Sequence, residues 1–99
     1  MKGTTKIASA NAATRSQFTA TTDTKIVGAS QERRTLKIYN TPGSPVLYIG
    51  QGAAAVTNAD YTLQLNPGSY YTADQSEVSL EHHAMFAAAN GTALVTLGS

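Results

Sequence analysis

Short stretches in which apolar and polar residues alternate recur along most of this chain. The clearest lies between Thr35 and Asn40, where Leu36 and Ile38 are separated by single polar or aromatic residues. A period of two is typical of a β-strand with one buried face. We therefore expect Leu36 and Ile38 in the core and Tyr39 on the opposite face of the strand.

Further short apolar runs follow the same pattern, separated by residues that favour turns. We expect strands within residues 14–21, 25–28, 35–40, 46–49, 61–65, 70–72, 78–80, 83–89 and 92–97. The segment Asn40–Pro45 contains two prolines and a glycine, which favour chain reversal. It predicts a hairpin between the strands on either side of it.

The segment 83–89 is ambiguous, because alanine, methionine and phenylalanine also favour helices. We interpret it as a strand because it is short and is followed by Asn90-Gly91. Asn-Gly is the strongest two-residue hairpin signal. It therefore predicts a hairpin with the strand at 92–97.

About eight short strands with turns every 8–12 residues indicate an all-β, antiparallel fold. A sandwich and a small barrel, jelly-roll-like in either case, both fit this spacing. We expect one domain over residues 13–99. Residues 1–12 have neither helical nor strand periodicity and form an N-terminal arm, either a free tail or a segment that becomes ordered on a neighbouring subunit.

Composition limits the classes of function. The 99 residues include no cysteine, which excludes thiol catalysis and thiolate metal sites. Net charge is +1 and only 13% of residues are charged. The chain has no basic stripe for nucleic acid and no apolar stretch for a membrane span or a secretory signal. We expect a protein made in the cytoplasm, binding neither nucleic acid nor membrane, whose weakly charged surface contacts other proteins.

No group of residues points to an enzyme or a cofactor. Glu81 and His83 are two positions apart and can converge on one face of a strand, but a zinc site normally needs three or four ligands. The carboxylates Asp60, Asp74 and Glu77 lie near turns, where they favour local backbone hydrogen bonds. We expect no catalytic residue, no metal and no cofactor.

The candidate interface residues are cations, tyrosines and one histidine. Alternation predicts Arg34 on the core side of the strand entry and Arg33 outside, acting as local ion-pair partners or as ligands for a partner's carboxylate. Tyr39 and Tyr48 are expected opposite the apolar face, and Tyr70 and Tyr71 on different faces. The full set is Lys6, Arg15, Arg33, Arg34, Tyr39, Tyr48, Tyr70, Tyr71 and His83.

The order of several short motifs resembles a set of small virion proteins of tailed bacteriophages. The motifs are RRTLKIYN at 33–40, VLYIG at 46–50, AVT at 55–57, YTLQL at 61–65, PG at 67–68 and AAANG at 87–91. The similarity extends over about residues 13–98 and departs from the pattern at Glu81-His82-His83.

The resemblance implies a β-sandwich module on the surface of the virion. The expected function is a capsid decoration, or cement, protein that binds the major capsid protein on the outside of the head and bridges capsomers as a homotrimer. The alternative is a module of a head fibre, tail fibre or spike that binds the host surface.

Overall fold

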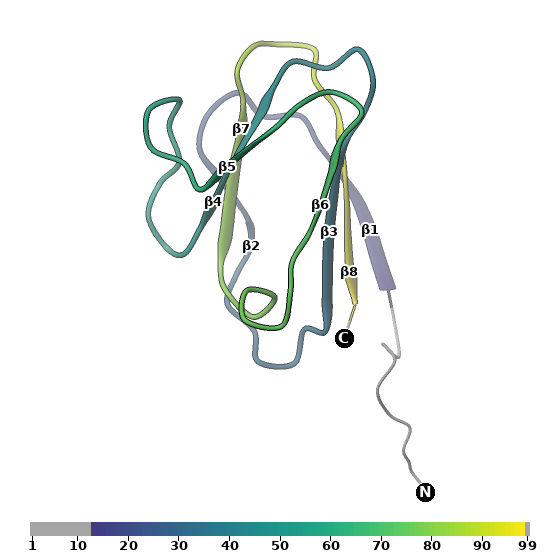
Figure 1. Cartoon of the computed structure of the whole chain (residues 1–99), viewed down its shortest axis with the longest axis vertical. Helices are drawn as coiled ribbons and strands as arrows, with labels where there is room; N and C mark the ends of the chain where they lie inside the picture. The colour runs from purple at the N-terminus through teal and green to yellow at the C-terminus, as the bar shows by residue number, and fades with distance from the viewer. Residues whose placement is uncertain (1–12, 99) are drawn as a thin grey trace, which may run out of the picture.

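The computed structural model describes residues 13–98 and confirms the all-β class. The fold in this range is eight strands without a helix (Figure 1). They are β1 (Ala13–Phe18), β2 (Thr24–Val27), β3 (Thr35–Asn40), β4 (Leu47–Gln51), β5 (Leu63–Leu65), β6 (Tyr70–Thr72), β7 (His82–Phe86) and β8 (Ala93–Gly98). The predicted arm at residues 1–12, with Lys6, lies outside the described residues.

The strands form two four-stranded antiparallel sheets, with orders β1-β8-β3-β6 and β2-β7-β4-β5. The pairs β1·β8, β2·β7, β3·β6 and β4·β5 correspond to one long hairpin that is rolled up with its tip between β4 and β5. This is the jelly-roll order. Of the two architectures that the spacing allowed, the molecule adopts the sandwich.

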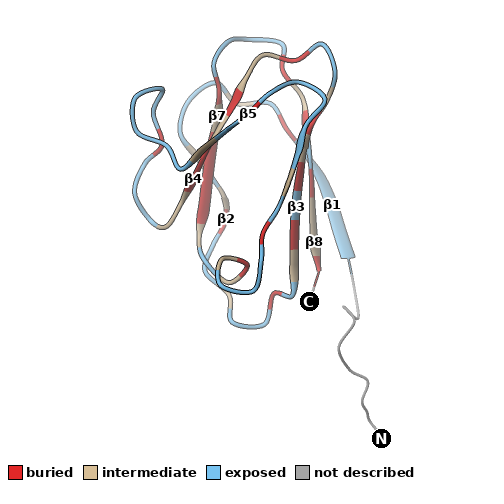
Figure 2. Ribbon diagram, in the orientation of Figure 1, coloured by how far each residue is buried: buried red, intermediate tan, exposed pale blue. Residues whose placement is uncertain are grey.

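The core lies between the two sheets (Figure 2). Alternate residues of the inner strands fill it, as the period of two predicts. Leu36 and Ile38 are 0% and 1% exposed, in agreement with the sequence-based expectation. They pack with Leu47, Ile49, Ala84, Phe86, Ala93 and Val95. Burial of each large side chain stabilises the fold by about 1.5–3 kcal/mol.

The predicted hairpin between residues 35–40 and 46–49 is wrong. A turn does form, and Gly43 adopts a φ of 86°, but β3 and β4 belong to different sheets. The side chain of Asn40 stabilises the crossing, because its Nδ2 donates to the carbonyls of Pro45 and Leu65, each at 2.9 Å.

The predicted hairpin at Asn90-Gly91 is also wrong, because β7 and β8 lie in opposite sheets. Residues 87–92 instead carry the chain across the end of the sandwich. Asn90 has a φ of 73°, which asparagine tolerates better than most residues. Gly91 is needed for another reason: its backbone lies against the ring of Phe86.

The strand expected around Val78 and Leu80 is a turn. Its backbone bonds are local, with Val78 N donating to Asp74 O at 2.9 Å and Leu80 N to Glu77 O at 3.0 Å. Val78 is nevertheless buried and closes one end of the core.

Candidate functional site

The outer face of the β1-β8-β3-β6 sheet carries an ordered row of side chains. Cross-strand register aligns Gln17 with Leu94, Leu94 with Tyr39, and Tyr39 with Tyr70. The row therefore spans all four strands. Tyr70 is 72% and Leu94 41% exposed. We call these four residues the outer-face row.

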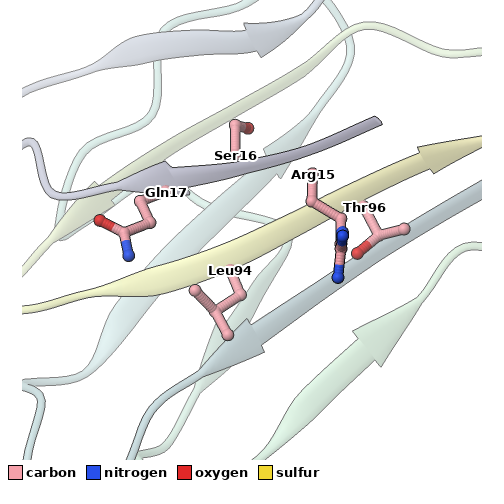
Figure 3. A pocket seen from close by; sticks show the side chains of 5 residues that line it. All are labelled: Arg15, Ser16, Gln17, Leu94 and Thr96. Atoms are coloured by element: carbon pink, nitrogen blue, oxygen red, sulfur yellow. The ribbon is translucent and has the colours of Figure 1, made fainter. Parts of the chain in front are cut away.

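Cations lie beside the outer-face row. The next aligned positions on the same face are Arg15, Thr96, Lys37 and Thr72. A groove of about 440 Å³ runs along β1 and β8, lined by Arg15, Ser16, Gln17, Leu94 and Thr96. In Figure 3 the side chain of Ser16 projects to the other side of the strand from Arg15 and Gln17. Exposed tyrosine and arginine are typical of protein-binding surfaces.

The tyrosines divide as predicted, but into three environments. Tyr39 and Tyr70 lie on the outer face just described. Tyr71 points inward, where its hydroxyl accepts a bond from Gln51 Nε2 (2.9 Å) and contacts His82 Nε2 (3.0 Å). This network joins the two sheets, so the hydroxyl of Tyr71 is already engaged inside the molecule.

Burial shifts the pKa values of two residues in this inner network. It raises the pKa of Tyr71 and lowers the pKa of His82. The imidazole of His82 is therefore held neutral, with Nδ1–H donating to the carbonyl of Leu80 at 2.9 Å and Nε2 accepting from the tyrosine hydroxyl. These donors and acceptors satisfy one another, as buried polar groups normally do.

Tyr48 lies on the outer face of the other sheet, where its ring packs on Tyr61 with centroids 4.8 Å apart. Both Tyr39 and Tyr48 avoid the core, as expected. They nevertheless face opposite sides of the sandwich, so one flat partner surface does not reach both.

The predicted placement of the arginine pair is wrong. Arg33 is 8% exposed and Arg34 is on the surface. Arg33 donates from Nε to Val78 O (2.7 Å), from Nη1 to Gly28 O (2.9 Å) and from Nη2 to Leu80 O (2.6 Å). The alternation rule fails here because β3 begins at Thr35, so both arginines belong to the preceding loop.

Glu81 and His83 converge, as their spacing predicts, with Oε2 and Nε2 2.6 Å apart. The sequence did not indicate the second partner, Asp23, whose Oδ1 lies 2.9 Å from His83 Nδ1. Asp23 also accepts from the backbone N–H of Val56 at 2.8 Å. The cluster thus ties the β1–β2 turn, the β4–β5 loop and β7 together.

The contacts in this cluster shift the pKa values of both His83 and Asp23. The hydrogen bond between His83 and Glu81 raises the pKa of His83, and the hydrogen bond to Asp23 raises it further. The bond from Val56 is the main reason that the pKa of Asp23 is lowered. The two carboxylates contact opposite ring nitrogens, so they do not converge on one point. Within residues 13–98, no group of three or more histidine and acidic side chains is arranged to hold a metal ion.

Comparison with known proteins adds no relative: neither a family model nor a curated protein nor a solved structure matches the chain. Within the described part of the chain, no helix is long and apolar enough to cross a membrane.

Proposed function

We propose that this protein is a decoration protein of a tailed-phage head, which binds the major capsid protein and bridges capsomers as a homotrimer without catalysing a reaction. Its location is the outer surface of the capsid. The resemblance of the motifs in residues 33–91 supports this proposal. The jelly-roll order is compatible with it, since that architecture occurs in viral capsid proteins as well as in lectins and cupins.

The outer-face row is the observation that carries the proposal. Tyr70, on the edge strand β6, and Leu94, on the inner strand β8, are exposed large side chains on one four-stranded face. Standard interfaces bury about 600–1,000 Å² on each partner. This is a small part of the accessible surface of 5540 Å².

The test is co-sedimentation of the purified protein with tailed-phage heads prepared without it. We expect Tyr70→Ser and Leu94→Ser each to weaken binding about tenfold or more, the effect of removing a central interface residue. Tyr61→Ser is the matched control, because it removes an exposed tyrosine from the opposite side of the sandwich. Circular dichroism and denaturation check that the variants fold. Undiminished head binding by the Tyr70→Ser, Leu94→Ser double variant would refute the proposal.

The fibre or spike alternative has one observation in its favour, the Tyr48–Tyr61 pair. Tyr61 is 40% exposed, and its hydroxyl donates to Gln64 Oε1 at 3.2 Å. An aromatic face beside an amide suits a host-surface ligand such as a sugar. The same variants separate the two functions: loss of host-cell binding in Tyr61→Ser, with the outer-face variants unaffected, supports the appendage module.

A further inference from the structure

The loops 28–34 and 73–81 meet at the lower end of the sandwich in Figure 1. A polar hollow lies between residues of these loops. Its volume is about 390 Å³. The hollow is separate from the outer-face row and from the Tyr48–Tyr61 pair. We call it the arginine hollow, and its lining residues are Gln31, Arg33, Arg34, Gln75 and Val78.

Arg33 lies in the wall of the arginine hollow, and protein acceptors use only some of its N–H groups. A guanidinium has five N–H groups, and the three carbonyls of Gly28, Val78 and Leu80 use three of them. Two N–H groups remain without a protein acceptor among residues 13–98. Because the three carbonyls come from both loops, the group is fixed in place before any ligand arrives.

The charge of Arg33 lacks an anionic partner in the described part of the chain. The ion pairs found there both belong to His83, although buried charges in proteins are normally paired. The acids of the 73–81 loop are engaged elsewhere: Glu81 with His83, Glu77 with the N–H of Asp74, and Asp74 with Ser76. None of them lines the hollow.

Two further kinds of donor line the same hollow. Arg34 adds a second guanidinium, and its backbone is anchored by the bond from its N–H to Gly98 O at 2.7 Å. Gln31 and Gln75 contribute amides from the two loops, and both residues are exposed. A hollow lined by cations and amides, with no acidic side chain in its wall, is suited to an anion.

We propose that the arginine hollow binds a carboxylate group. The planar fork of a guanidinium matches the two oxygens of a carboxylate. The carboxylates of Glu32, Asp74 and Glu77 on the same two loops disfavour a doubly charged ligand such as phosphate more than a singly charged one. The carboxylate belongs either to an acidic segment of a partner protein, which rests on the proposed function, or to a small free acid.

The test follows the Nε–H resonance of Arg33 by NMR during titrations of the full chain with sodium acetate, the capped peptide Gly-Ser-Glu-Ser-Gly, which carries one carboxylate, and inorganic phosphate. Arg34→Gln removes one guanidinium, and Arg34→Lys keeps the charge without the fork. Arg15→Gln is the matched control, because it removes the same charge from a different face. These variants leave the carbonyl contacts of Arg33 intact.

We expect a saturable shift with acetate and with the peptide, weakened about tenfold in Arg34→Gln, as expected for loss of a charge-assisted bond. Arg34→Lys should bind with intermediate affinity, and Arg15→Gln like the unmodified chain. Tighter binding of the peptide than of acetate assigns the site to a partner segment, whereas equal affinity assigns it to a small free acid. The proposal is overturned by the absence of a saturable shift, by equal loss in Arg15→Gln, or by tighter binding of phosphate. Head binding through Tyr70 and Leu94 is measured separately, so either proposal can fail alone.

Discussion

Replacing Gly91 by alanine forces a new methyl group into the ring of Phe86. A Cβ on Gly91 would lie 2.5 Å from Cδ1, 2.6 Å from Cε1 and 2.7 Å from Cγ of that ring. These separations are well below the optimum of about 3.5–4.0 Å for carbon atoms. Phe86 is 0% exposed and packs on Phe18 with ring centroids 5.9 Å apart. The ring therefore moves only at the expense of the core.

The expected loss of stability is about 1–3 kcal/mol, the usual effect of overpacking a core. Backbone strain adds little, because Gly91 is not among the glycines with positive φ. For a domain of this size, each kcal/mol lowers Tm by about 4–8 °C. Phe86→Ala costs stability by itself, but it removes Cγ, Cδ1 and Cε1, the ring atoms that clash. The double variant should be more stable than the sum of the single losses predicts, by about 0.5 kcal/mol or more.

The assay is urea denaturation of the single and double variants, with Gly28→Ala as the control. A Cβ on Gly28 meets nothing within 4 Å, and Gly28 also lacks a positive φ. Alanine at position 28 should stabilise the protein by about 0.4–1 kcal/mol, because it lowers the conformational entropy of the unfolded chain. The reasoning fails if Gly91→Ala is as stable as the unmodified protein, or if the losses in the double variant simply add.

Three further predictions concern buried polar groups and assembly. Because the pKa of His83 is raised above its ordinary value of 6.5, its stabilising contribution is complete below that value and is lost as pH rises through the folded pKa. Denaturation against pH should therefore show the advantage over His83→Gln shrinking above neutral pH, and a constant difference would contradict this. Asn40→Asp should cost about 3 kcal/mol or more in thermal unfolding at neutral pH, because a buried carboxylate would face the carbonyls of Pro45 and Leu65; Asn66→Asp, at an exposed position, is its control. Light scattering should give a mass near three times 10.3 kDa, and a monomer would count against a preformed trimer.

The strands could be predicted from the sequence much better than their partners. Alternation is a local property, so residues 35–40 identify a strand and its buried face. Turn residues such as Gly43 show that the chain reverses, but they do not show into which sheet it goes. In the jelly roll, successive strands mostly change sheets, and the hairpins expected from local turn chemistry are replaced by crossings.

The same distinction explains the polar clusters. Glu81 and His83 could be paired from their spacing on one strand, whereas Asp23 is 60 positions from His83 and reaches it only through the fold. Arg33 was misplaced because the period of two ends where β3 begins. Arg33, just before β3, and Asn40, its last residue, are both buried and both donate to backbone carbonyls of other segments. In this protein the RRTLKIYN segment therefore secures the two ends of a strand.

The position of β8 has a consequence for how the protein is made. It is the last of the eight strands along the chain, yet it lies in the interior of its sheet and pairs with both β1 and β3. Until residues 93–98 leave the ribosome, neither partner strand has this neighbour. At a synthesis rate of about 5–20 residues per second, β1 waits about 4–16 s for β8. During this delay the nascent chain exposes unpaired apolar strands, and the sheet β1-β8-β3-β6 is completed only after residues 93–98 become available.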